Sequence, residues 1–203
     1  MAGKHCNENF IHECGLPKEE IKNYVKKITD MGFDTRQIMD ILDFYLFYAP
    51  ILKSDANPDL FGCKSLREYG WCGNSDMSKL EGRILKASGI GVFCFVKAES
   101  ISQTLQAMDF GNRMCVEHPR AVLKHNYGIT VNEDGTVVVK QRETRMECLF
   151  RHIRNSIAHN HTYLFPNDNL LIEDADDNRQ LSARILMPRH ALVDWMDIVK
   201  DGV

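Results

Sequence analysis

The sequence predicts a mainly α fold, organised as one domain (residues 1–203) with small β-hairpin insertions. Several stretches repeat apolar residues at helical spacing between ordinary helix start and stop signals. The β-prone pieces are short and lie around turn signals. We see no internal repeat, low-complexity tract or linker, and 203 residues suffice for one buried core.

Residues 1–16 are polar, and we expect them to form a loose N-terminal segment. The segment contains four residues that could bind zinc: His5, Cys6, His12 and Cys14. Their spacing matches no standard zinc finger, and no second ligand pair follows closely. A metal site in this segment is therefore the less favoured interpretation.

Two helices are expected next. The first begins near Pro17, whose fixed φ suits a first helical turn, and ends at Gly32. The second follows a cap at Asp34 or Thr35 and ends before Pro50. Their inward positions are Ile21, Tyr24, Val25, Ile28, Ile38, Ile41, Leu42, Tyr45 and Leu46. The short link between them predicts an antiparallel helical hairpin.

The middle of the chain, residues 51–126, carries weaker signals. A helix is expected from Ser78 to Ala87, and a second amphipathic one from Ser100 to Phe110. The Ser-Gly-Ile-Gly stretch at 88–91 lacks the glycine pattern and the Gly-Lys-Ser/Thr of phosphate-binding loops. We therefore interpret that stretch as a tight link between two buried elements.

The last third combines short β-prone segments with two helices, the first of them at 142–161. Residues 129–139 alternate around an Asn-Glu-Asp-Gly turn, which predicts a β-hairpin. Three β-prone pieces follow that first helix: Tyr163 to Phe165, Leu170 to Ile172, and Leu181 to Leu186. A final helix begins near Pro188 and buries Ala191, Leu192, Trp195 and Ile198.

Composition and charge favour a cytoplasmic protein. The net charge of -3 gives no overall attraction to nucleic acid, so any anion binding must come from a local cluster. Seven cysteines cannot all pair within one chain. The first residues lack the apolar core of a secretory signal. The longest apolar run, Ile90 to Val96, is too short to cross a membrane.

The helix expected at 142–161 has two contrasting faces. Its apolar face repeats at i, i+3, i+4 and i+7: Met146, Leu149, Phe150, Ile153 and Ile157. The opposite face carries Arg151, Arg154, Asn155 and His159. An apolar face opposed to a cationic, proton-active one is unusual in a mildly acidic protein.

The hexapeptide R-N-S-I-A-H at 154–159 resembles the signature of the HEPN superfamily. The motif closes a long amphipathic helix, β-prone segments follow, and a last helix carries an aromatic anchor, Trp195. The resemblance covers residues 141–200. The family of plasmid-encoded HEPN proteins of similar length looks closest.

The resemblance implies a HEPN-like helical bundle and a metal-independent endoribonuclease without a cofactor. In that family, the RNA 2′-hydroxyl attacks the adjacent phosphate at a composite Arg/His site between two protomers. Many members act as toxins or in defence against phage and are inhibited by a partner protein. Some members are catalytically silent and bind RNA or a partner protein instead.

The residue chemistry agrees with this implication. An unperturbed imidazole has a pKa near 6.5, so His159 suits proton transfer at neutral pH. The guanidinium of Arg154 can bind phosphate with two donors, and Asn155 can orient the histidine or donate to the phosphate. Arg151 and His161 are expected to assist in substrate binding. No metal is required because the substrate carries its own nucleophile.

Helix geometry predicts a homodimer. Positions five apart point about 140° from each other on an ideal helix. Arg154 and His159 therefore flank a face centred near Arg151 and Asn155. Two such faces meeting about a two-fold axis would bring two arginines and two histidines together.

Two alternatives stay open. A non-enzymatic module could bind RNA or a partner protein through the same cationic face, with binding weakened by salt. A metal-dependent protein could instead use the N-terminal His/Cys cluster. An arginine and a histidine at a helix C-terminus are also what the helix dipole favours.

Overall fold

The structure of the protein is a computed structural model. It describes residues 23–52, 63–101, 103–104, 113–119, 121–125, 138–175 and 181–203.

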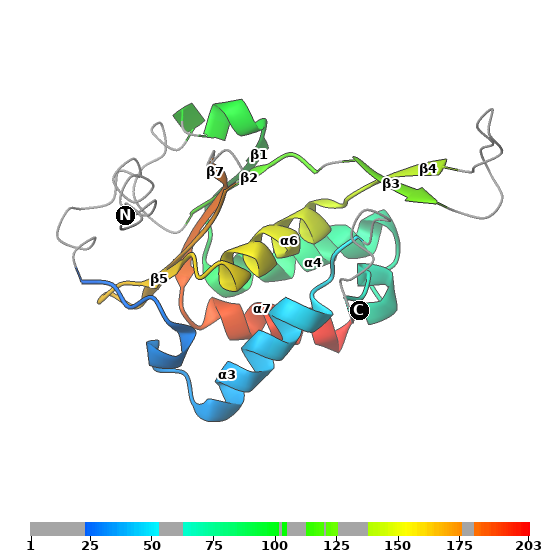
Figure 1. Cartoon of the computed structure of the whole chain (residues 1–203). Helices are drawn as coiled ribbons and strands as arrows, with labels where there is room; N and C mark the ends of the chain where they lie inside the picture. Colours follow the sequence, from blue (N-terminus) through cyan, green and yellow to red (C-terminus); the bar gives the residue numbers. More distant parts are fainter. Residues whose placement is uncertain are drawn as a thin grey trace.

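The described part has an α/β fold, so the expectation of a mainly α, HEPN-like helical bundle with small hairpin insertions is wrong. A five-stranded mixed sheet has the order β1-β2-β7-β6-β5 (Figure 1). The strands are β1 Val92–Val96, β2 Arg113–Glu117, β5 Thr162–Leu164, β6 Asn169–Ala175 and β7 Leu181–Pro188. The three β-prone pieces near the C-terminus are therefore the centre and one edge of a sheet, not insertions.

The sheet pairs β1 and β2 in parallel, with Cys94 opposite Cys115, and its other neighbours are antiparallel. The β6–β7 ladder shifts its register between Asp174 and Ala175. A separate two-stranded ribbon, formed by β3 (Ala121–His125) and β4 (Val138–Arg142), extends away from the sheet (Figure 1).

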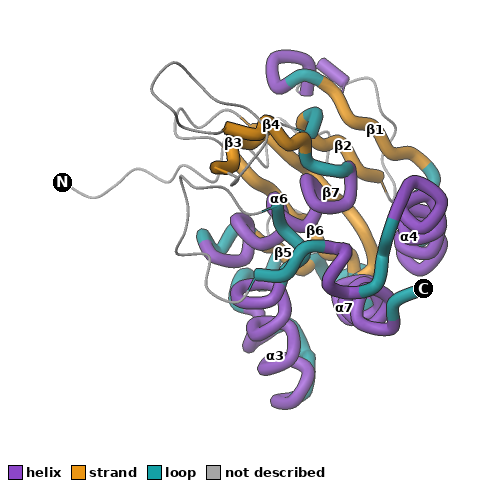
Figure 2. Tube along the Cα trace, turned by 90° about the vertical axis from the view of Figure 1, so that its right-hand side faces the viewer, coloured by secondary structure: helices purple, strands orange, loops and turns teal. Residues whose placement is uncertain are grey.

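Four α-helices are described: α3 Thr35–Leu42, α4 Gly73–Ser88, α6 Arg145–Ala158 and α7 Ala191–Asp201. α3 continues as a π-helix, η2 (Asp43–Tyr48), and the short 3-10 helices are η1 Ile28–Asp30, η3 Leu66–Tyr69 and η4 Ala98–Ser100. Figure 2 shows the helices and strands of the described residues along the Cα trace. None of the described helices is long and apolar enough to cross a membrane.

The helices pack against one face of the sheet. The main core joins residues of all four helices to alternate strand residues, such as Leu170, Ile172 and Ile185. The intervening residues Leu171 and Leu186 belong to a second cluster with Tyr163 and Phe165 on the opposite face. One cluster covers each face of β6 and β7, so the residues of these two strands are almost all buried.

Strand β1 is exposed or half-buried and strand β2 is almost wholly buried, and neither is easy to predict. A strand buried on both faces lacks the alternation that marks a half-buried strand, and a short apolar run fits a helix equally well. β1 reads V-F-C-F-V, and β2 reads R-M-C-V-E with a buried arginine. The sequence therefore suggests only a link and a mixed region where these two strands lie.

Several expected elements are confirmed. The second helix is α3 with η2, and Asp34 makes the expected cap by accepting from the Gln37 backbone N–H at 2.8 Å. The helix expected at 78–87 lies within α4, and the final helix is α7. Gly89, at φ 61°, ends α4 in the left-handed conformation, so the 88–91 stretch does link two elements.

The first expected helix is not formed over residues 23–27, and the described part of its range contains a single short 3-10 helix, η1. Val25 is extended and pairs with Leu164 through two backbone hydrogen bonds of 2.8 Å. The start of that helix at Pro17 and the N-terminal segment 1–16 lie outside the described residues. Most of the helix expected at 100–110 and residues 129–137 of the expected hairpin also lie outside them.

Candidate functional site at the end of helix α6

Helix α6, which carries the R-N-S-I-A-H motif, is firmly fixed at its start. Thr144 and Glu147 form a capping box: the Thr144 hydroxyl accepts from the Glu147 N–H at 3.1 Å, and the Glu147 carboxylate accepts from the Thr144 N–H at 2.9 Å. Most of the helix is buried between the sheet and α4 or η2. Solvent reaches the helix at its two ends, at Arg145 in the first turn and at Ala158 and the C-cap His159 in the last.

The C-terminus of α6 ends in a Schellman turn. His159 is the C-cap, and Asn160 adopts the left-handed conformation with φ 57°. The His161 N–H donates to the Ser156 carbonyl at 2.7 Å, and the Asn160 N–H donates to that of Ile157 at 3.1 Å. Asparagine tolerates this conformation better than most residues.

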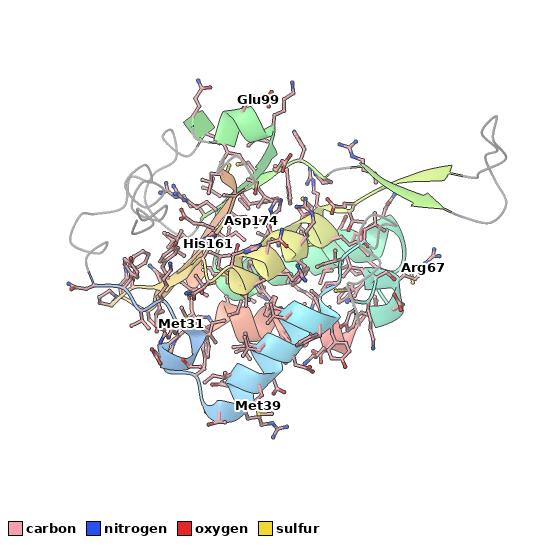
Figure 3. The ribbon with its side chains drawn as sticks, in the orientation of Figure 1. Met31, Met39, Arg67, Glu99, His161 and Asp174 are labelled. Carbon is pink, nitrogen blue, oxygen red and sulfur yellow. The ribbon has the colours of Figure 1, made fainter. Side chains whose placement is uncertain are left out.

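The turn brings the imidazoles of His159 and His161 close together. Their ring centroids are 6.1 Å apart, with the rings tilted by 37°. His159 is exposed and His161 is half-buried. Figure 3 shows His161 beside the end of α6, where the chain enters β5. Two of the predicted site residues are therefore neighbours.

The pKa of His161 is lowered from its ordinary value, first by burial and then by the positive charges of Lys26 and His159. Glu173 and Asp174 act in the opposite direction. Lys26 lies over the ring of Tyr163 at 5.3 Å. His161 is therefore held mainly in its neutral form at neutral pH.

Asn155 and Arg154 occupy the preceding turn of α6. The Asn155 side-chain amide donates to Asp174 Oδ2 at 3.2 Å, which ties the motif to strand β6. Arg154 is half-buried, and its Nη1 donates to Asn155 Oδ1 at 3.4 Å. Its Nε is buried and has no hydrogen-bond partner among the described residues. The structure thus joins Arg154, Asn155 and Asp174 in one chain of polar contacts.

Asp174 also binds His152, which is buried beneath the motif. The Nδ1 of His152 lies 2.7 Å from Asp174 Oδ2 and 3.4 Å from Ser182 Oγ. Burial lowers the pKa of His152, so the neutral ring donates through Nδ1 to the carboxylate. No partner for Nε2 is present within the described residues.

Ser182, His152 and Asp174 do not form a nucleophilic triad. In such a triad the serine and the carboxylate contact opposite nitrogens of the imidazole. Here both contact Nδ1, and the His152 side chain is only 1% exposed. The cluster is a buried scaffold that holds Asn155 in place.

Arg151 is separated from the exposed site. Its guanidinium makes two hydrogen bonds to Glu143, from Nε to Oε1 at 2.7 Å and from Nη2 to Oε2 at 3.1 Å. Burial lowers the pKa of Arg151, but the bonds to Glu143 outweigh that effect and raise it above the ordinary value. The face expected around Arg151 is therefore closed to solvent.

The sequence pattern does not reveal Asp174 or Lys26 as supporting residues, and it places His152 only beside the motif, as an adjacent helper. Asp174 is an acidic residue at the end of an apolar run, which is a weak signal for a buried functional contact. Its partners on α6 are 19 and 22 residues away in the chain. Only the fold brings them together.

No cluster of three or more potential metal-binding side chains occurs within the described ranges. The four N-terminal His and Cys residues, 5 to 14, lie outside those ranges.

A cavity of about 510 Å³ lies at the opposite end of α6, lined by residues that include Trp71, Arg142 and Glu147. A helix rises about 1.5 Å per residue, so the cap at Thr144 is about 22 Å from His159. This cavity contains none of the predicted site residues.

Comparisons with protein-family models, curated proteins and solved structures give no match for this chain. The functional assignment therefore rests on the residues and geometry of the α6 terminus.

Proposed function

We propose that the protein is a metal-independent endoribonuclease whose site lies at the exposed end of α6. The observation that carries the proposal is the pair of imidazoles, His159 and His161, whose ring centroids are 6.1 Å apart at the end of the helix that also carries Arg154 and Asn155. Proton-transfer groups next to a cation suit the cleavage of a phosphodiester.

RNA is the substrate that fits this set of groups. Cleavage through the 2′-hydroxyl needs proton transfer and stabilisation of a phosphorane, but no external nucleophile and no metal. His159 supplies proton transfer, and the guanidinium of Arg154 binds the phosphate. Asn155, held by Asp174, orients this end of the helix toward the substrate.

The resemblance of R-N-S-I-A-H to the HEPN signature supports the same reaction. Because the fold is α/β, that support comes from the motif and its helix rather than from a helical bundle. Within this proposal the protein acts as a homodimer in the cytoplasm, in a toxin or anti-phage role, with an inhibitory partner protein. The exposed last turn of α6 is the surface available to a second copy.

A binding module without turnover is the second candidate. It is favoured by the contacts of Asn155, whose amide already donates to Asp174 and whose oxygen already accepts from Arg154. In this alternative the same surface binds RNA or a partner protein, and added salt weakens RNA binding.

The test is cleavage of RNA by purified protein in the presence of EDTA. We expect the wild type to cut and His159→Ala to lose about 10²–10⁴-fold in rate, the usual contribution of a positioned acid or base. His190→Ala is the matched control, since His190 is an exposed histidine at the start of α7. Equal rates for His159→Ala and wild type would exclude the proposed site, and binding without cutting would favour the second candidate.

A further inference from the structure

We propose that His161 is a second catalytic residue, which takes the proton of the RNA 2′-hydroxyl while His159 of the same chain protonates the leaving 5′-oxygen. This inference rests on the proposed ribonuclease function. It extends the role of His161 from substrate binding to chemistry.

The separation of the two rings suits a phosphodiester between them. Proton transfer requires each imidazole nitrogen to lie about 2.6–3.2 Å from the oxygen with which it exchanges the proton. The ring centroids are 6.1 Å apart, so one phosphate group can contact both rings, one on the nucleophile side and one on the leaving-group side. A single histidine would have to serve both sides.

The backbone holds the pair in a fixed geometry. The Schellman turn fixes the two residues on either side of Asn160, and the His161 carbonyl accepts from the Glu173 N–H of β6 at 3.0 Å. The position after the left-handed residue commonly carries an apolar side chain that packs on the helix. Here it carries an imidazole, half-buried beside an exposed one.

The surroundings of the two rings assign their roles. Lys26 lies before η1, His159 ends α6, and Glu173 and Asp174 belong to β6; these charged and titratable groups act on His161. Burial and the two cationic groups prevail, so the pKa of His161 is lowered and the ring is neutral, as a base must be. His159, in contrast, is exposed to solvent.

The proposed reaction is a transesterification in which one histidine accepts a proton and the other donates one. His161 removes the 2′-hydroxyl proton as the 2′-oxygen bonds to phosphorus. The bond from phosphorus to the 5′-oxygen breaks, and that oxygen receives a proton from the His159 imidazolium. The products are a 2′,3′-cyclic phosphate and a free 5′-hydroxyl. Exchange of protons with water restores both imidazoles, so no oxidant, metal or other reactant is needed.

Because both histidines lie in one turn, the proton-transfer pair is complete within one chain. The second copy in the proposed homodimer would then add cationic surface for RNA rather than a missing histidine. This differs from a composite site, in which residues from two chains must share the reaction.

The first experiment compares His161→Ala, His161→Gln, His159→Ala and the control His190→Ala on one RNA, with circular dichroism to verify folding. We expect both His161 variants to lose about 10²–10⁴-fold in rate. They should still bind an RNA whose cleavage site carries a 2′-deoxyribose. If only the alanine variant is misfolded, the glutamine variant decides. A folded His161 variant that cuts at the wild-type rate overturns the inference.

The second experiment separates acid from base. An RNA whose leaving 5′-oxygen is replaced by sulfur needs no protonation at that atom, because a thiol is far more acidic than an alcohol. We expect this substrate to restore cleavage by His159→Ala but not by His161→Gln. The assigned roles are contradicted if the sulfur substitution restores cleavage in neither variant, or if it restores cleavage in His161→Gln alone. A purely structural role for His161 would not depend on the leaving atom.

The third experiment mixes His159→Ala with His161→Ala. Activity stays lost if each site uses both histidines of one chain, and returns if the pair is shared between copies, which would overturn the same-chain assignment. The proposed function fails differently: wild-type protein that never cuts RNA in EDTA removes both proposals. If the wild type cuts RNA and the activity requires His159 but not His161, only the inference about His161 is overturned.

Discussion

The ion pair between Arg151 and Glu143 allows a test of whether Arg151 stabilises the fold or binds RNA. The two side chains are 8% and 0% exposed and share two hydrogen bonds. Removing one partner of a buried ion pair costs about 3–5 kcal/mol, because the other charge stays buried without it. We therefore expect Arg151→Met to lower the free energy of unfolding by about 3–5 kcal/mol. At this chain length that corresponds to a fall in Tm of about 6–20 °C.

Urea unfolding followed by circular dichroism measures this loss. Arg145→Met is the matched control on the same helix, because the Arg145 side chain is 58% exposed; its loss should stay below about 1 kcal/mol. The double variant Arg151→Met/Glu143→Met should lose less than the sum of the single losses, since neither charge is then left alone. If Arg151→Met unfolds like the wild type but binds RNA more weakly, the arginine belongs to the substrate site and the structural reasoning is refuted.

Two further predictions concern the residues around the site. Because burial lowers the pKa of His152 in the folded protein, the unfolded chain binds more protons below the ordinary value near 6.5, and stability should fall as pH drops from about 6.5 through the lowered value. His152→Gln should flatten that fall in urea titrations at pH 7.5, 6 and 5, and an unchanged pH dependence would contradict it. Asn160→Gly should keep the free energy of unfolding, whereas Asn160→Ala should lower it by about 1–2 kcal/mol, because φ at this position is 57°. Equal losses in both variants would argue against the Schellman turn.

Local signals were sufficient to predict the elements near the site. The amphipathic pattern of α6 and the apolar positions of α7 depend on neighbours within a few residues, and those helices are confirmed. The segments of β5, β6 and β7 were recognised from their turn signals. Their assembly with β1 and β2 was not predicted, because the pairing of strands that are distant in the chain leaves no local pattern, and the buried strand β2 also lacks a polar–apolar alternation.

The same limit applies within the site. The motif names Arg154, Asn155 and His159, but only the fold shows that Asn155 is held by Asp174. The approach of His161 to His159 has a local cause, the left-handed Asn160, and an asparagine after the last helical residue is a recognised C-terminal signal. That signal is present in the sequence. The burial of Arg151 could not be predicted from the sequence, because its partner Glu143 lies before the helix begins.

The chemical ends that the protein leaves on RNA distinguish the proposed ribonuclease from a metal-dependent nuclease and from a binding module. Purified protein is incubated with a defined RNA in EDTA, and the fragments are analysed by mass spectrometry. We expect fragments with 2′,3′-cyclic phosphate and 5′-hydroxyl ends from the wild type and from His190→Ala. His159→Ala should give no such fragments. Fragments with 3′-hydroxyl and 5′-phosphate ends, or intact RNA at every protein concentration, would contradict it.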